Sequence, residues 1–242
     1  MSNGHSLKKT ARLAGLLYVL MSIQAPIALL YVPSHILVAS NPTATINNII
    51  AHEFLFRLSI ISQLTSIIIF MFLAFVLYRL FKQVNEFQSK LLVAFVVVQV
   101  PMAFIFETLS YASLMIAKGE ILQAVQTEQK QALVMLLLKI HSYGIVTAEI
   151  FWGLWLLPFG QLVYKSGFIP KVFGFLLFYG GICWIVDSVT SLLFPTYGPL
   201  VSEIVTKTGW VGEIPIMLWL LIKGVKNNII TPEDNAGTWN TQ

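Results

Sequence analysis

Charged residues are scarce in this chain of 242 residues, at 11%, whereas an ordinary soluble domain carries about 25%. Hydrophobic residues make up 57% of the chain, and its mean hydropathy is +0.78. A chain with so few charges cannot cover a folded surface with solvated groups. The scarcity of charge therefore excludes a water-soluble enzyme, a nucleic-acid-binding domain and a disordered protein, and it predicts an integral membrane protein embedded in a lipid bilayer.

Cysteine is almost absent, because Cys183 is the only one, and an intramolecular disulfide is thereby excluded. The sequence also lacks the H-E-x-x-H motif of zinc proteases, the G-x-S-x-G motif of hydrolases and the Walker loop of ATPases. The two-residue alternation that is typical of membrane-barrel strands is missing as well. These absences leave any cofactor unidentified and indicate a membrane protein built from helices.

Long apolar runs are abundant. Because a hydrocarbon core of about 30 Å needs roughly 20 apolar residues in a helix, the sequence predicts a single-domain, all-α bundle of six transmembrane helices. The first run follows basic residues without an A-x-A-like cleavage site, so we expect it to be retained. The fourth run is unusually long, and the sixth is short and contains Pro215. The predicted spans are residues 13–32, 58–81, 91–117, 133–164, 171–194 and 209–226, followed by a mobile cytoplasmic tail, 227–242.

The distribution of lysine and arginine predicts the orientation. Cytoplasmic loops carry an excess of both residues, and here they concentrate in alternate connections and at both ends of the chain. The predicted cytoplasmic side, which includes the segment 1–12, holds Lys8, Lys9, Arg12, Arg79, Lys82, Lys90, Lys165, Lys171, Lys223 and Lys226. The opposite side holds only Arg57, Lys118, Lys130 and Lys207. Both termini are therefore predicted to be cytoplasmic.

The loop 33–57 is the longest connection on the non-cytoplasmic side. Its stretch TATINNIIAHEFLF has apolar residues at helical spacing, which predicts a short interfacial helix after Pro42.

Several ionisable residues lie inside the predicted spans, where each costs about 2.5–3.5 kcal/mol near the bilayer centre. With the predicted orientation they fall in the outer halves of the helices or near the midplane, as do Gln24 and Gln63, while the inner halves are almost purely apolar. This asymmetry predicts a polar, hydrated cavity that is open to the non-cytoplasmic side and closed toward the cytoplasm. The candidate ligand-binding residues are Glu107, His141, Glu149, Asp187 and Glu213.

Helical spacing indicates which faces carry these groups. On the fourth span, His141, Ile145, Ala148 and Trp152 share one face. Glu149 lies about 80° away from His141 around that helix, close enough to point into the same cavity. The two residues are about 12 Å apart along the axis, so we expect them to communicate only through a ligand, water or neighbouring helices.

On the fifth span, Gly180, Cys183, Asp187 and Ser191 form a face of small residues that allows close helix packing.

A structural role is the alternative for each of these residues. Asp187 and Glu107 could pair with Lys139 or Arg57 and fix helix register, while Glu213 and Lys139 could extend toward the headgroups. His141 could be an ordinary core histidine. The tryptophans are expected to act as packing and interface anchors; they are Trp152, Trp155, Trp184, Trp210 and Trp219.

Three functions follow as hypotheses. The first is a transporter-like or sensing module that binds a small polar or cationic ligand in the outward-facing cavity. The second is an intramembrane enzyme that could use a divalent metal held by His141, Glu149, Glu107 and Asp187. The third is a membrane assembly partner that uses the loop 33–57.

Seven segments resemble the bacterial membrane-protein family known as domain of unknown function 4386, and the resemblance covers about residues 8–226. It implies a multi-helix protein of the bacterial inner membrane and supplies no activity and no functional residues. The segments are KKTARLAGLLYV (8–19), YVPS (31–34), HEFLFRLSI (52–60), LYRLFKQVN (77–85), IFWGLWLLPFGQLVYKSGFIPKVFG (150–174), LLFP (192–195) and LWLLIKGVK (218–226).

Overall fold

The computed structural model describes residues 2–26, 31–38 and 41–225, and within these it contains helices and no strand. The predicted tail, 227–242, lies outside the described residues. In chain order the helices are α1 (Ser2–Pro26), α2 (Val32–Ile36), α3 (Pro42–Ala51), α4 (Glu53–Phe81), α5 (Glu86–Val97), α6 (Gln99–Ala117), α7 (Thr127–Lys165), α8 (Lys171–Leu193), α9 (Gly198–Thr208), the 3-10 turn η2 (Gly209–Val211) and α10 (Ile214–Ile222).

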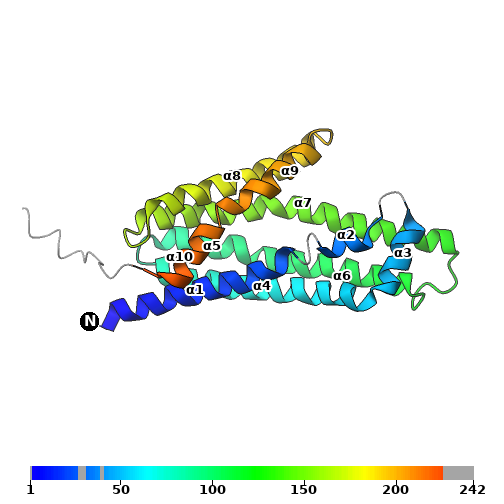
Figure 1. Ribbon diagram of the computed structural model, residues 1–242, viewed down its shortest axis with the longest axis horizontal. Coiled ribbons are helices and arrows are strands. Elements are labelled where there is room, and N and C mark those ends of the chain that lie inside the picture. The colour runs from blue at the N-terminus through cyan, green and yellow to red at the C-terminus, as the bar shows by residue number, and fades with distance from the viewer. Residues whose placement is uncertain (1, 27–30, 39–40, 226–242) are drawn as a thin grey trace, which may run out of the picture.

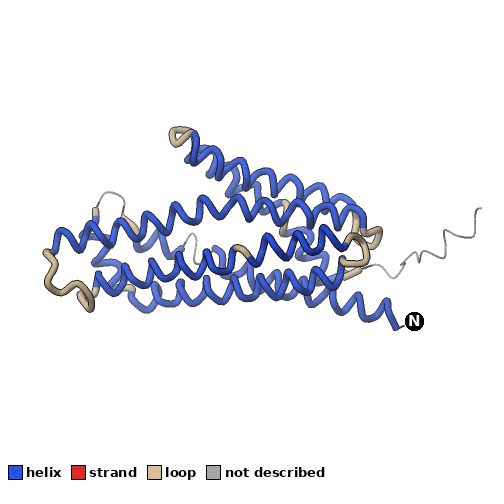
Figure 2. Tube along the Cα trace, turned by 180° about the vertical axis from the view of Figure 1, so that it is seen from behind, coloured by secondary structure: helices blue, strands red, loops and turns tan. Residues whose placement is uncertain are grey.

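The long helices lie side by side along one axis and form an elongated bundle (Figure 1). The start of α1 and the helix α10 lie at the same end of this bundle, and α2 and α3 lie toward the other end. The hairpin of α8 and α9 diverges from α7 at its tip, which is also visible from behind (Figure 2). This arrangement agrees with the predicted all-α bundle.

Five helical segments of the described chain are long and apolar enough to cross a membrane. They are Glu53–Phe81, Glu86–Ala117, Thr127–Lys165, Lys171–Leu193 and Gly198–Ile222. The predicted first span, 13–32, overlaps α1 but is not among the five, and residues 27–30 lie outside the described part of the chain. The architecture is that of a helical multi-pass membrane protein.

The last span differs from its prediction. It begins at Gly198 rather than at residue 209, and it consists of α9, η2 and α10 instead of one helix. Pro215 provides the physical reason for the break, because proline cannot donate a hydrogen bond to the carbonyl four residues earlier and its ring clashes with that carbonyl. A search for one continuous apolar run therefore found only the second half of this span.

The third span is also interrupted. α5 ends at Val97 and α6 starts at Gln99 within the apolar segment Glu86–Ala117. Pro101 cannot donate to the carbonyl of Val97, so the regular helical ladder is broken there. The break places Gln99 at the inner wall of the bundle, where its side chain is only 3% exposed.

α7 is the longest helix, with 39 residues. At a rise of 1.5 Å per residue it is about 58 Å long, nearly twice the thickness of a hydrocarbon core of about 30 Å. It extends beyond the predicted span 133–164 at its N-terminal end, and Pro158 lies buried inside it without ending it.

Glycines bring α7 and α8 into close contact. A Cβ atom on Gly153 would collide with the carbonyl oxygen of Gly181, and a Cβ atom on Gly160 would lie 2.9 Å from the carbonyl oxygen of Gly174. Small residues at such positions let two backbones approach in a membrane, where van der Waals packing rather than the hydrophobic effect holds helices together.

The end of the bundle that contains the start of α1 has a densely packed apolar core. Side chains from α4, α5, α7 and α10 are completely buried there, among them Leu77, Leu92, Phe159 and Leu220. Arg12 of α1 donates a hydrogen bond to the carbonyl of Ile222 (3.2 Å) and so satisfies a free carbonyl at the end of α10.

At the opposite end, α3 packs against α6 and α7. Asn41 accepts a hydrogen bond from the amide of Ala44 (3.0 Å) and caps the start of α3. Ile49 of α3 is fully buried in a second apolar cluster with Leu114 and Val134. The short helix predicted after Pro42 is therefore present, and it covers the ends of the longer helices.

Candidate functional site

A cavity of about 170 Å³ lies inside the bundle, between the apolar core near the start of α1 and the end covered by α3. Residues from α1, α4, α6, α7, α8 and the segment between α9 and α10 line it. Its polar wall includes Gln63, Ser66, Gln99, Glu107, His141 and Glu213. These polar groups come from four separate segments, namely α4, α6, α7 and the residues before α10, and they meet at one cavity in an otherwise apolar protein.

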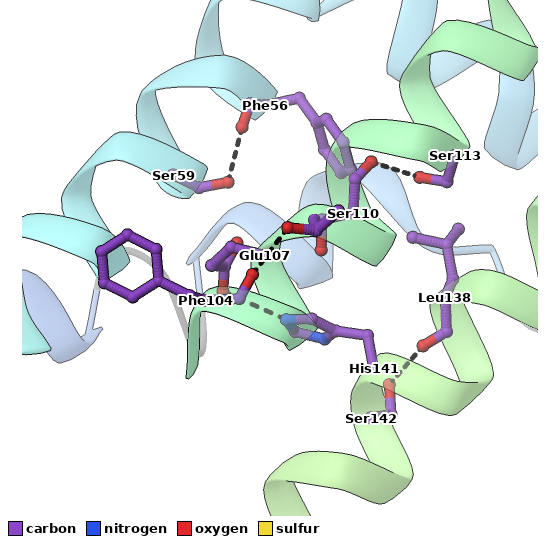
Figure 3. A network of polar contacts seen from close by, with 10 residues as sticks. Phe56, Ser59, Phe104, Glu107, Ser110, Ser113, Leu138, His141 and Ser142 are labelled. Carbon is purple, nitrogen blue, oxygen red and sulfur yellow. Dashed lines mark hydrogen bonds and ion pairs between the residues drawn. The ribbon is translucent and has the colours of Figure 1, made fainter. Parts of the chain in front are cut away.

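His141 and Glu107 form a pair across the wall of this cavity. His141 Nε2 of α7 lies 3.2 Å from Glu107 Oε1 of α6, and the Glu107 side chain is 7% exposed (Figure 3). Figure 3 shows the imidazole extending from α7 toward the carboxyl group of Glu107. The buried carboxyl group of Glu107 therefore has a hydrogen-bond partner from the neighbouring helix, as buried polar groups require.

The α7 face predicted from helical spacing lines the cavity. His141, Ile145, Ala148 and Trp152 all contribute to its wall. Glu149, which was expected to point into the same space, does not belong to the wall, so an offset of about 80° is enough to turn it away. One oxygen of Glu149, Oε2, is buried without a hydrogen-bond partner.

Gln99 occupies the break between α5 and α6. Its Nε2 donates to the carbonyl of Phe95 (2.8 Å), while its Oε1 is buried and accepts no hydrogen bond in the described structure. A buried carbonyl oxygen without a partner costs free energy comparable to a lost hydrogen bond. The cavity wall therefore contains an unused hydrogen-bond acceptor.

Glu213 lies in the interrupted part of the last span, directly before α10. Tyr18 of α1 donates its hydroxyl hydrogen to Glu213 Oε2 over 2.5 Å, and the Trp184 side chain also faces this carboxyl group. The predicted extension of Glu213 toward the headgroups is therefore wrong. The carboxyl group points into the bundle and is held between α1 and α8.

Four tryptophans, Trp152, Trp155, Trp184 and Trp210, line the cavity and also pack against other aromatic rings, as expected of them. Trp152 and Trp184 meet edge to face with ring centroids 5.4 Å apart, and Trp184 meets Trp210 in the same way at 5.9 Å. Trp155 stacks on Phe159 with centroids 5.5 Å apart and connects the cavity wall to the apolar core.

The charge of the cavity wall is one-sided. Two carboxyl groups, Glu107 and Glu213, line it together with one imidazole, and none of the described lining residues is lysine or arginine. The predicted pairing of Glu107 with Lys139 or Arg57 is wrong, because Glu107 contacts His141, Lys139 is exposed and Arg57 pairs with Glu53 at 2.7 Å. The ionisable groups that line the cavity are therefore mainly acidic.

Asp187 is buried apart from the cavity, on the face of α8 that contacts α9. It accepts hydrogen bonds from Ser202 (2.5 Å) and Ser191 (3.4 Å), and it is 2% exposed. Its pairing with Lys139 or Arg57 is also wrong. Gly180, on the same face, lies where an added Cβ would be 3.1 Å from the carbonyl oxygen of Gly209, so this face allows the close packing expected of it.

The residues suggested as metal ligands do not come together. Of His141, Glu149, Glu107 and Asp187, the structure brings only His141 and Glu107 into contact. Within the described residues, no group of three or more histidine, cysteine, aspartate or glutamate side chains could hold a metal ion.

Gln99, Tyr18 and the four cavity tryptophans were not predicted as site residues. Gln99 and Pro101 stand close together in an apolar run, and a proline there indicates a break at which a polar side chain can be buried. That signal could have identified Gln99. The direction in which Tyr18 and the tryptophans point depends on packing between helices, which no local pattern reports.

The model of the family described as Domain of unknown function (DUF4386) matches residues 13–224. The chain belongs to this family. The DUF4386 match includes every residue that lines the cavity. An uncharacterized protein of Archaeoglobus fulgidus is 40% identical over 95 residues, or 37% of this chain. That match spans 55% of the length of the archaeal relative, about half. No solved structure matches the chain. Because DUF4386 carries no assigned activity, a function must be argued from the cavity.

Proposed function

We propose that this membrane protein binds a small cation in its central cavity, as a transporter-like or sensing module. The observation that carries the proposal is the pair of cavity carboxyl groups, Glu107 and Glu213, in a wall without lysine or arginine among its described residues. Ionisable groups inside a membrane bundle are costly and mark ligand or ion pathways by default. A bound cation would compensate both carboxylates.

The interrupted last span supports a transporter-like role. In many transporters, discontinuous helices form the substrate site near the middle of the membrane, because the ends of the half-helices leave backbone groups free for a ligand. Here the break between α9 and α10 lies at the cavity and contributes Trp210 and Glu213 to its wall. The apolar core around Leu77 and Phe159 closes the cavity on the side of the start of α1. A sensing role is compatible with this closed core, whereas transport requires the core to open.

Neutralising the cavity carboxyl groups is expected to abolish cation binding. The test uses the purified chain in detergent and a panel of sodium, tetramethylammonium and benzylammonium chlorides at constant ionic strength, with tryptophan fluorescence as the readout. We expect a saturable change with at least one cation, weakened about tenfold or more by Glu107→Gln or Glu213→Gln and lost in the double variant.

Glu86→Gln is the matched control for these variants. Glu86 is exposed and pairs with Lys90 on the surface (2.9 Å), so its replacement should leave cation binding unchanged. The proposal fails if no cation in the panel gives a saturable signal, or if the folded double variant binds as the unmodified chain does.

The orientation is a second part of the proposal, with both termini in the cytoplasm and the cavity facing the opposite side. Lysine and arginine concentrate in the terminal segments and connections at one end of the bundle. The positive-inside rule assigns that end to the cytoplasm. A fluorescent protein fused after residue 242 should fluoresce in a bacterial host, and alkaline phosphatase at the same place should be inactive. The reverse pattern would overturn this orientation.

A further inference from the structure

We infer that the ligand of the cavity is a protonated organic amine, with its ammonium group near the carboxyl groups and its carbon body against the tryptophan rings. This inference rests on the proposed cation-binding function and specifies the chemistry of the ligand. Three features of the cavity wall support it: its size and carbon surface, its aromatic rings, and its unused hydrogen-bond acceptors.

The size and surface of the cavity suit an organic molecule. An engineered apolar cavity of about 150 Å³ accommodates benzene, so the cavity of about 170 Å³ has room for a compact organic ligand. Apart from its few polar groups, its wall is made of carbon, with Phe70, Phe106, Ile67 and Met102 among the lining residues. A hard inorganic cation such as Ca²⁺ requires six to eight oxygen ligands, which this wall does not provide.

The tryptophans provide a surface for a cation. Trp152, Trp184 and Trp210 all line the cavity and form a chain in which successive rings meet edge to face at 86°. The face of tryptophan attracts cations more strongly than that of any other side chain, and ammonium groups desolvated next to such rings are bound most tightly. Glu213 also lines the cavity and places a carboxyl group near the Trp184 ring.

The hydrogen-bonding groups of the wall select an amine that carries N–H bonds. Gln99 Oε1 has no donor among the described residues, and Glu107 contacts His141 Nε2 through one of its two oxygens. A primary ammonium group offers three N–H donors to such acceptors, whereas a quaternary ammonium ion offers none. A neutral alcohol of the same shape offers one O–H donor and lacks the positive charge that would compensate the two carboxyl groups.

The test compares three probes that separate these contributions. Benzylamine is protonated at neutral pH, benzyl alcohol has the same shape without the charge, and tetramethylammonium has the charge without N–H donors and without an aromatic ring. Binding is measured by tryptophan fluorescence excited where the probes do not absorb, and by the shift of the thermal unfolding midpoint. We expect benzylamine to bind at least tenfold more tightly than either comparison probe, since one charge-assisted hydrogen bond alone accounts for about tenfold.

Gln99 provides the decisive variant. Gln99→Leu and the closer isostere Gln99→Met remove the unused acceptor, and we expect either to weaken benzylamine binding about tenfold while leaving tetramethylammonium binding unchanged. Gln83→Leu is the control, because Gln83 is exposed at the end of α4. Each variant is checked for a cooperative thermal transition, which shows that it is folded. Because leucine and methionine differ in shape, a loss of binding common to both variants reports the loss of the acceptor.

The outcomes distinguish this inference from the proposed function. Binding of sodium or tetramethylammonium that depends on Glu107 and Glu213, without binding of benzylamine, would refute the inference that the ligand is an amine. The proposed cation-binding function would still be supported. If benzyl alcohol binds as tightly as benzylamine, or if both Gln99 variants bind benzylamine normally, the inference is overturned. If no cation binds at all, the proposed function fails together with it.

Discussion

Replacing Trp155 by alanine is expected to lower the free energy of unfolding by about 3–5 kcal/mol, the range for truncating a large buried aromatic side chain. Trp155 is 3% exposed and lies between Phe70 (4.9 Å between ring centroids) and Phe159 (5.5 Å), with Tyr18 at 5.9 Å. These rings come from three helices, so the space left by the indole cannot close by the movement of one helix. Equilibrium unfolding in mixed detergent micelles measures the loss.

Two variants frame this prediction. Trp155→Phe keeps one ring and should lose clearly less stability than Trp155→Ala. Tyr143→Ala removes an aromatic side chain that is 64% exposed on the outside of α7, and it should change stability little. A loss below about 1 kcal/mol for Trp155→Ala would contradict the packing described for this part of the bundle.

Gly15→Ala is expected to destabilise the contact between α1 and α10 by about 1–3 kcal/mol or more, the usual cost of overpacking. A Cβ atom at this position would lie 2.6 Å from Leu221 Cα and 2.8 Å from the carbonyl carbon of Leu220. Both are backbone atoms, so no side-chain rotation can relieve the collision. The measurement is again equilibrium unfolding in detergent.

Gly209→Ala is the matched control, because it is the same substitution in the same bundle. The nearest atoms to a Cβ at Gly209 belong to the Trp184 ring at 3.4 Å, which is near ordinary contact distance. We expect this variant to be close to the unmodified chain. Equal stability of Gly15→Ala and Gly209→Ala would show that α1 and α10 do not approach as closely as described.

The sequence predicted the fold class because it depends on the length and apolarity of the runs. The second and fourth predicted spans lie within α4 and α7, and the fifth matches α8 to within one residue. The third predicted span lies within Glu86–Ala117, but its break near Pro101 was not predicted, and neither was the extent of the sixth span around Pro215. Hydropathy measures how apolar a segment is and not whether each amide has a partner. The loss of one hydrogen bond at proline breaks the helix without changing the hydropathy of the run.

The candidate site was predicted in part, for a related reason. Periodicity along α7 placed His141 and Trp152 on the face that lines the cavity, because residues three or four apart share a side of a helix. It could not indicate which neighbour each face meets. Periodicity therefore did not predict that Glu107 contacts His141. It also did not predict that Asp187 faces Ser202 instead of the cavity.

The length of α7 has a practical consequence for further work on this protein. At about 58 Å, it continues past the hydrocarbon region, and α3 packs on α6 and α7 at that end to form a small folded platform. At 27.1 kDa the chain is too small to align readily as a single particle in electron cryomicroscopy. An antibody fragment raised against α3 and the start of α7 would bind outside the detergent belt and add the mass that particle alignment needs.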